Sequence, residues 1–391
     1  MLEQARRLLQ PSARSAVPPF MVMDVVAAAA RLEAQGRRVI HMEVGQPAAG
    51  APAAALAAAR AALSSGPLGY TETRGIASLR RRIARAYRDW HRLDVDPDRI
   101  IVTTGSSAGF ILAFLAAFEA GDRVAMALPG YPPYRHTLTA LGCEPVAIET
   151  NPQSRWAISS ETLLAHHRAT PLKGLVIGSP ANPTGTMMSA PAFAALIQCA
   201  NDAGIAVISD EIYHGLEYAF AAESAARITD DVIIINSFSK YFCMTGWRIG
   251  WMVVPPALVR PIERLQQNLA ISVPTLSQIA AEAAFDGRAE LETVKRGYEE
   301  NRTILLEGLP RAGLDSFLPP DGAFYLYADV SRFSRDSLDF ATQMLKETGV
   351  AVTPGIDFDP SRGRDFIRLC YAGGSGDMRE AVERIGAWLK G

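Results

Sequence analysis

The sequence predicts an α/β fold, in which a mostly parallel central sheet has helices on both faces and is joined to a smaller α+β domain. Between residues 100 and 254, short apolar runs alternate with helical segments, a pattern typical of parallel strands connected by helices. Polar residues repeatedly follow the ends of these apolar runs. Beyond residue 286, helices and strands follow a different order, which predicts the second domain.

The length sets the number of domains. The 391 residues suffice for one large and one smaller domain. We expect an N-terminal arm and helix over residues 1–38 that belong to the small domain. The large domain then covers residues 39–285, and the C-terminal part of the small domain covers residues 286–391.

Charge, hydropathy and cysteine usage argue against several classes of protein. The net charge of -2 gives no sign of a nucleic acid or a membrane as partner, and no apolar run approaches the ~18 residues of a membrane span. The four cysteines are scattered, and the six histidines form no ligand motif. We therefore expect reduced thiols, a cytoplasmic protein and no metal site.

The elements before residue 100 are mostly helical. Residues 1–19 are polar and then proline-bearing, which favours an arm over part of a core. Apolar periodicity and stop residues predict the elements that follow. These are a helix at 21–35, a strand at 39–44, a helix at 52–63 and a basic helix from 76 to about 92.

Short apolar strands dominate the chain from residue 100. Strands are predicted at 100–104, 123–128, 145–149, 175–178, 206–209, 232–235 and 249–254. Helices are predicted from 105 to Gly121, at 190–203, at 256–271 and from 276 to about 309. The small domain then has strands at 322–329, 350–353 and 366–371 and helices at 337–348 and 378–390.

Five polar residues that lie far apart in the sequence each follow a predicted strand. In open α/β sheets the ligand site lies outside the carboxyl ends of the strands. We therefore expect these residues to converge on one crevice. They are Ser106, Tyr131, Asn182, Asp210 and Lys240.

Lys240 stands at the centre of the most distinctive stretch, residues 236–250. A lysine just past a buried strand can lose its proton and act as an amine nucleophile. Ser237, Ser239 and Arg248 offer the groups that a phosphate needs. An isolated S-x-K is more often a surface lysine, but an amine that forms Schiff bases beside a phosphate cup indicates pyridoxal phosphate.

An ordered set of short motifs resembles that of the class I/II aminotransferases, which are fold-type I pyridoxal phosphate enzymes. Four motifs carry the resemblance: Asn182-Pro-Thr-Gly185, Ser209-Asp-Glu-Ile-Tyr213, Ser237-Phe-Ser-Lys240 and Gly246-Trp-Arg-Ile-Gly250. It extends through Gly45-Gln-Pro47, Gly322-Ala-Phe-Tyr325 and Ile367-Arg-Leu369. Each motif alone is weak, whereas the ordered set covers nearly the whole chain and is highly specific.

The resemblance implies the chemistry at the cofactor ring. Lys240 would hold the cofactor as a Schiff base and then move the proton between the substrate Cα and the cofactor. Asp210 would keep the ring nitrogen protonated, so that the ring acts as an electron sink. Tyr213 and Asn182 would donate to the phenolic oxygen, and the Asn182–Pro183 peptide is cis in similar enzymes.

The phosphate would lie where a helix begins after the strand at 100–104. The backbone amides at Ser106, Ser107 and Ala108, with the helix dipole, form an anion site there. Ser237, Ser239 and Arg248 would complete the cup. Relatives often have a larger polar residue where this chain has Ala108, which weakens the side-chain contact there but not the backbone role.

The resemblance also implies the substrate contacts and a shared site. Tyr131 would stack on the ring, and Tyr70 resembles the tyrosine that reaches the phosphate of a neighbouring subunit, which implies a homodimer. The guanidinium of Arg368 would grip the substrate carboxylate in two parallel hydrogen bonds. Gly45 would let the backbone approach the substrate closely.

The resulting hypothesis is an aminotransferase that moves an amino group from an L-amino acid to an α-keto acid. The alternative keeps the cofactor but changes the reaction, to a carbon–sulfur β-lyase or an enzyme like aminocyclopropane-carboxylate synthase, which share these motifs. We expect the side-chain pocket to come from residues 17–20, the loop around Tyr70 and residues 271–274. The first and last are apolar, which favours alanine, methionine or aromatic side chains.

Overall fold

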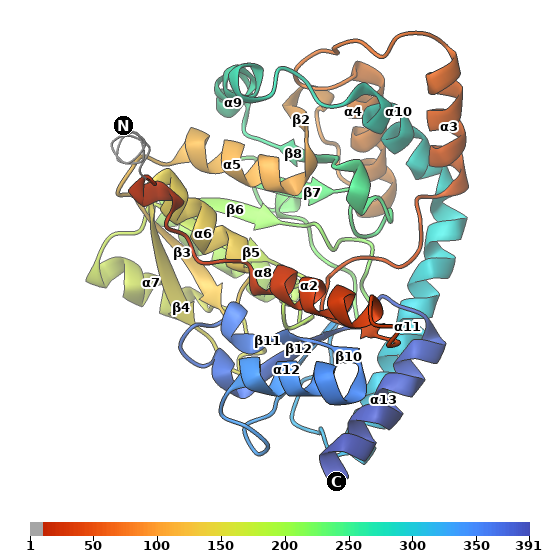
Figure 1. Ribbon diagram of the computed structural model, residues 1–391. Helices are drawn as coiled ribbons and strands as arrows, with labels where there is room; N and C mark the ends of the chain where they lie inside the picture. Colours follow the sequence, from red (N-terminus) through yellow and green to blue (C-terminus); the bar gives the residue numbers. More distant parts are fainter. Residues whose placement is uncertain (1–10) are drawn as a thin grey trace, which may run out of the picture.

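The computed structural model describes residues 11–391, so the first ten residues of the expected N-terminal arm lie outside the described part. A central sheet has seven strands in the order β2-β8-β7-β6-β5-β3-β4 (Figure 1). The strands are β2 Ile100–Thr103, β3 Arg123–Leu128, β4 Glu144–Glu149, β5 Gly174–Gly178, β6 Ala206–Asp210, β7 Ile233–Ser237 and β8 Gly250–Val253.

The sheet is mostly parallel, as the sequence predicts. Only β8 runs antiparallel, to β2 on one side and β7 on the other. Between β7 and β8 the chain has one short helical turn, η5 (Thr245–Trp247). A parallel return usually runs through a crossover helix, and no α-helix lies between β7 and β8. The segment between the two strands carries Lys240.

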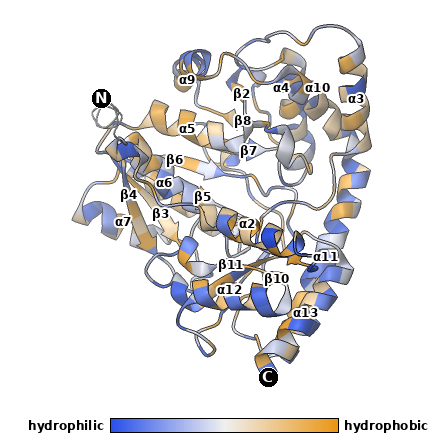
Figure 2. Cartoon of the chain, viewed as in Figure 1, coloured by the Kyte–Doolittle hydropathy of each residue, from blue (hydrophilic) through white to orange (hydrophobic). Residues whose placement is uncertain are grey.

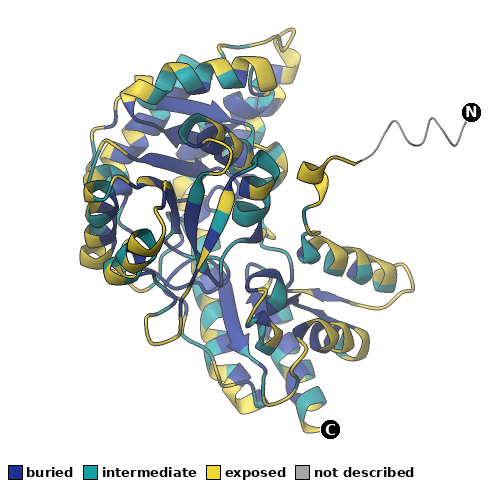
Figure 3. Cartoon of the chain, turned by 90° about the vertical axis from the view of Figure 1, so that its left-hand side faces the viewer, coloured by how far each residue is buried: buried dark blue, intermediate teal, exposed yellow. Residues whose placement is uncertain are grey.

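Side chains alternate between the two faces of the sheet, and helices cover both. In β7, Ile233 and Ile235 pack in one apolar cluster and Ile234 packs in another. The first cluster includes α5 Gly105–Ala117, α6 Pro132–Leu141 and α9 Pro256–Leu269. The second includes α3 Ala53–Ser64, α4 Ala77–Ala86, α7 Ser160–Ala169, α8 Ala190–Asp202 and α10 Thr275–Ala284. Apolar residues dominate the central strands, which are buried, while the edge strand β4 and the outer helix faces carry exposed residues (Figures 2 and 3).

A smaller part is built on two short sheets. The antiparallel sheet β11-β12-β9 consists of β9 Tyr325–Asp329, β11 Thr353–Pro354 and β12 Phe366–Cys370, and β1 Ile40–His41 pairs with β10 Val350–Ala351 in parallel. Its helices are α2 Met21–Glu33, α11 Arg288–Ala312, α12 Ser337–Thr348 and α13 Ser375–Lys390. In Figure 1, α2 lies between the large sheet and this part, and α11 extends along both. The boundaries at residues 39 and 286 stay a prediction.

The short helical turns complete the description. They are η1 Ala13–Ser15, η2 Tyr87–His91 (a π-helix), η3 Pro97–Arg99, η4 Ala225–Arg227, η6 Phe285–Gly287, η7 Gly355–Asp357 and η8 Gly363–Asp365. Within residues 11–391, no helix is both long enough and apolar enough to cross a membrane.

Many element boundaries shift by a few residues from the prediction, and three differences are larger. The helices α6 and α7 are additions, and α6 begins at Pro132 because proline is tolerated in the first turn of a helix. The predicted strand at 350–353 is two strands, since β10 pairs with β1 and β11 pairs with β12. The predicted strand at 39–44 is reduced to the two residues of β1.

Candidate active site

A cavity lies at the carboxyl ends of β6 and β7, where the large sheet meets the smaller part. Its volume is about 790 Å³, counted with its opening to solvent. Most of the predicted site residues line it together. They are Gly45, Ser106, Ser107, Tyr131, Asn182, Tyr213, Ser239, Lys240, Arg248 and Arg368.

Four predicted residues lie outside this lining. Asp210 lines an adjoining cavity, whose wall includes Tyr131, Asn182 and Tyr213 as well. Ser237 supports the lining residue Ser239, and Ala108 lies in the first turn of α5. Tyr70 is 82% exposed and does not line the cavity of its own chain.

Lys240 presents an amine that can be neutral near physiological pH. It follows the buried strand β7, and its Nζ donates a 2.5 Å hydrogen bond to the carbonyl oxygen of Gly45. Burial, together with the nearby cations of Arg368 and Arg248, lowers the pKa of Lys240 to about 8. A neutral amine is the form that can attack a carbonyl group.

Asp210 is a buried acid at the end of β6, with 5% of its surface exposed. Its carboxylate accepts hydrogen bonds from the Tyr134 hydroxyl and, at 3.1 Å, from the Ile212 amide. Burial raises the pKa of Asp210 to about 6, although these two donors oppose the shift. A cation placed beside Asp210 would favour its ionised form.

Asn182 and Tyr213 bring polar groups to the same wall of the cavity. The Asn182–Pro183 peptide is cis, as the family resemblance implies. The Oδ1 of Asn182 accepts a 2.9 Å hydrogen bond from Arg368. The side-chain nitrogen of Asn182 can therefore donate to a ligand. The Tyr213 hydroxyl lies 2.7 Å from that of Tyr325.

The start of α5 forms an anion cradle with Arg248. Gly105 has a φ of +73°, and a Cβ there would lie 2.5 Å from an Arg248 nitrogen. Glycine at this position therefore allows the guanidinium to lie against the first turn of the helix. The helix N-terminus favours an anion, and Ser239, whose side chain accepts a 2.9 Å hydrogen bond from Ser237, adds a hydroxyl.

Arg368 is a buried cation without a carboxylate partner among the described residues. It lies on β12 with 2% of its surface exposed. Its guanidinium donates to Asn182 and to the carbonyl of Glu43, and it covers the Tyr325 ring at 4.4 Å from the centroid. Its Nε is buried with no hydrogen-bond partner. A buried charge is costly unless it is paired. An anionic ligand bound at Arg368 would provide that pairing.

The residues present fit pyridoxal phosphate and an amino acid. Within residues 11–391, no carboxylate lies within 4 Å of Lys240, Arg248 or Arg368. The cavity therefore holds three basic side chains that form no salt bridge with an acid of the described residues. A phosphate at Arg248 and a carboxylate at Arg368 would pair with two of them, and Lys240 is the amine in the same cavity.

The sequence analysis missed several residues of the site. Two of them, Val22 and Met23, come from the start of α2, next to Phe20, which also lines the cavity. Val44, Gln46, Ile212, Thr245 and Tyr325 complete the lining. Tyr134, the donor to Asp210, lies on α6, which was not predicted. Phe20 falls in the segment 17–20 that was expected to form the side-chain pocket, whereas residues 271–274 lie outside the lining.

Comparisons with known proteins identify the family and the fold. The profile of the family described as aminotransferase class I and II matches residues 37–385. The valine–pyruvate aminotransferase of Mycobacterium tuberculosis is 49% identical over 96% of this chain and 97% of its own length. A crystal structure of an aminotransferase from the same organism has a TM-score of 0.95 at 49% identity, covering 98% of this chain and 99% of that one. The Thermus thermophilus aspartate aminotransferase with maleate has a TM-score of 0.91 at 32% identity, covering 97% and 99%.

Proposed function

The chain belongs to the class I and II aminotransferases, a family that depends on pyridoxal phosphate, and from this premise we propose the role of each site residue. The protein moves an amino group from an amino acid to a keto acid. The relatives named above are aminotransferases, so the lyase alternative is not favoured. One observation carries the residue assignments, namely the three cations without carboxylate partners that surround one cavity beside Asp210.

Bound pyridoxal phosphate supplies an electron sink for the bond that breaks at the substrate Cα. Lys240 would hold the cofactor, and its neutral amine would take the proton from the substrate Cα. Asp210 would favour a proton on the ring nitrogen by placing a negative charge beside it. Asn182 and Tyr213 would donate to the phenolic oxygen, and Tyr131 would pack against the ring.

The remaining residues orient the two anionic groups. The first turn of α5, Ser237, Ser239 and Arg248 hold the phosphate. Arg368 binds the substrate carboxylate with two nitrogens, and this fixes the direction of the Cα–H bond. Gly45 lines the cavity and would let the backbone approach the substrate closely.

The amino donor has an apolar side chain in this proposal. Phe20, Val22 and Met23 contribute apolar surface from the start of α2. Among residues 11–391, the side-chain cations that line the cavity are Lys240, Arg248 and Arg368, and all three have other roles here. The described residues of one chain therefore line the cavity with no further cation for a distal carboxylate. A relative at 49% identity is named for valine and pyruvate, which agrees with this class of donor.

A half-reaction screen tests the substrate class. The visible absorbance of the holoenzyme is followed as L-valine, L-alanine, L-methionine or L-aspartate is added without a keto acid. We expect the apolar amino acids to react at least tenfold faster than aspartate. A faster reaction with aspartate would contradict the apolar assignment. Lys240→Ala, which should fold normally, is expected to give no reaction with any of them.

A homodimer with shared sites is also part of the proposal. Tyr70 is 82% exposed, and the apolar side chains Leu68, Leu269 and Ile271 near it are 40%, 60% and 51% exposed. The loops that carry them lie together, since Thr275 donates to the carbonyl of Gly69. An exposed apolar patch of this kind marks a protein interface.

A hybrid experiment tests the shared site. The variants Tyr70→Ala and Lys240→Ala are each expected to have low activity as homodimers. In a mixed dimer, the Lys240→Ala subunit supplies its Tyr70 to the site that still has Lys240, so mixing should restore activity. If mixing and subunit exchange restore nothing, Tyr70 does not act across the interface.

A cytoplasmic location completes the proposal. The cysteines Cys143, Cys199, Cys243 and Cys370 are all free thiols, and three of them are buried. Free thiols are typical of a reducing compartment. Fractionation of the source cells would test this, and recovery of the protein outside the cytoplasm would overturn it.

A further inference from the structure

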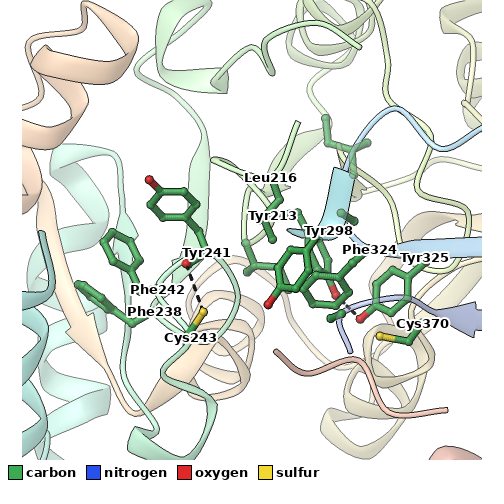
Figure 4. Packing of buried hydrophobic residues seen from close by; sticks show 14 of the residues in the cluster. Tyr213, Leu216, Phe238, Tyr241, Phe242, Cys243, Tyr298, Phe324, Tyr325 and Cys370 are labelled. Carbon is green, nitrogen blue, oxygen red and sulfur yellow. Dashed lines mark hydrogen bonds between the residues drawn. The ribbon is translucent and has the colours of Figure 1, made fainter. Parts of the chain in front are cut away.

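Two buried tyrosines meet at the wall of the cavity. Tyr213 follows β6 of the large sheet, and Tyr325 begins β9 of the smaller sheet. Their hydroxyl oxygens are 2.7 Å apart, and their rings meet edge-on with centroids 5.6 Å apart. They are 3% and 1% exposed, and both line the cavity. Figure 4 shows the two rings side by side with Phe324. The pair therefore connects the large and small parts of the protein at the site.

The hydroxyl of Tyr325 is held from several sides. A Cβ at Gly45 would lie 1.8 Å from it, so the absence of a side chain at Gly45 makes room for this hydroxyl. The Arg368 guanidinium lies over the Tyr325 ring at 4.4 Å from its centroid. Within residues 11–391, Tyr213 is the hydrogen-bond partner that the Tyr325 hydroxyl has. The position of Tyr325 is thus fixed by the residues proposed to bind the substrate.

The direction of the hydrogen bond follows from proton counting. A phenol hydroxyl has one proton to donate. When Tyr213 donates its proton to the phenolic oxygen of the cofactor, its own oxygen can only accept. Burial raises the pKa of both tyrosines, so both keep their protons at neutral pH. Tyr325 then has to be the donor of the pair.

We propose that Tyr325 is a positioning residue, which donates to Tyr213 and aims the Tyr213 hydroxyl at the phenolic oxygen of the cofactor. The proposal rests on the role of Tyr213 proposed above. A donor that itself accepts a hydrogen bond is polarised and donates more strongly. The Arg368 cation over the ring of Tyr325 attracts its electrons and makes its hydroxyl a better donor.

Hydrogen bonds to the phenolic oxygen would stabilise its negative charge, and this would lower the pKa of the link between the cofactor and Lys240. Loss of a donor to that oxygen should therefore raise the pH at which the visible absorbance of the holoenzyme changes. We expect Tyr325→Phe to raise this midpoint by about half a pH unit to one pH unit, the scale of one neutral hydrogen bond. Tyr213→Phe should raise it further, since it removes the direct donor.

A matched control comes from the same strand. Tyr327 lies two residues along β9, is 3% exposed, and its hydroxyl is buried without a partner among the described residues. It stacks on Phe366 with centroids 4.8 Å apart and does not line the cavity. Tyr327→Phe makes the same chemical change in the same sheet, so its absorbance midpoint should match that of the wild type.

The double variant Tyr213→Phe/Tyr325→Phe separates positioning from a general structural effect. Since Tyr325 acts through Tyr213, the double variant should titrate like Tyr213→Phe alone. A wild-type midpoint for Tyr325→Phe, or an added shift in the double variant, would overturn the inference. If Tyr213→Phe itself titrates like the wild type, the proposed role of Tyr213 fails and the inference fails with it. If only Tyr213→Phe shifts, the inference alone fails.

Discussion

Asp210→Asn should slow the amino transfer severely while preserving the fold. Asp210 is almost fully buried at the end of β6, where the Tyr134 hydroxyl and the Ile212 amide donate to its carboxylate. Burial raises the pKa of Asp210 to about 6, which means that burial disfavours the ionised form. A positively charged ring nitrogen would complete the pair. Asparagine keeps the shape of the side chain but supplies no charge.

The size of the effect follows from the burial of this pair. Removing one member of a buried ion pair costs about 3–5 kcal/mol, and each 1.4 kcal/mol is a factor of about ten in rate. The half-reaction with L-valine should therefore slow by about 10² to 10⁴-fold. Single-turnover absorbance measurements report this rate directly, and a thermal unfolding curve for each variant checks the fold.

A charge-matched control and a cofactor analogue sharpen this test. Asp202→Asn changes an exposed carboxylate at the end of α8 and should leave the rate near that of the wild type. A cofactor methylated at the ring nitrogen is permanently cationic, so it should recover part of the rate of Asp210→Asn. Retention of more than a tenth of the wild-type rate by Asp210→Asn would refute the assigned role.

Three further predictions concern the substrate side and stability. Arg368→Lys loses the planar two-point grip, so kcat/KM for L-valine should fall about 10- to 100-fold; an unchanged value would exclude the carboxylate role. Gly45→Ala would place a methyl group 1.8 Å from the Tyr325 hydroxyl, and this overpacking should lower stability by about 1–3 kcal/mol, which urea unfolding would detect. The pKa of His41 is raised to about 9, chiefly by its hydrogen bond to Glu43. Protonated His41 therefore contributes its full share to the free energy of unfolding below about pH 6.5, and this contribution is lost as the pH rises through about 9. The gap in unfolding free energy between the wild type and His41→Gln should shrink over that range, and a constant gap would contradict this.

Local patterns in the sequence predict much of the fold. The strand at 123–128 and the helix at 337–348 have the predicted bounds, because apolar runs and amphipathic periodicity identify buried strands and surface helices. The direction of β8 is not a local property, since it depends on the connection from β7. The separation of β10 from β11 depends likewise on the strands that each one pairs with.

The site was predictable where a residue follows a strand, and not where it comes from a distant helix. Asn182, Asp210 and Lys240 meet because the topology brings the strand ends to one edge of the sheet. Tyr134 contacts Asp210 from α6, 76 residues away in the chain. Tyr325 ends the motif Gly322-Ala-Phe-Tyr325, but its contact with Tyr213 depends on how the two sheets are placed.

The distribution of charge explains why the reaction was easier to infer than the substrate. Lys240 and Arg248 belong to the large sheet and Arg368 to the smaller one, so a bound amino acid carboxylate connects the two parts. Every amino acid has that carboxylate. The motifs whose residues bind it are therefore shared by enzymes that use different amino donors. We assign the selection among donors to Phe20, Val22 and Met23, which line the cavity at the start of α2. A substrate preference thus depends on a few apolar side chains that no motif identifies.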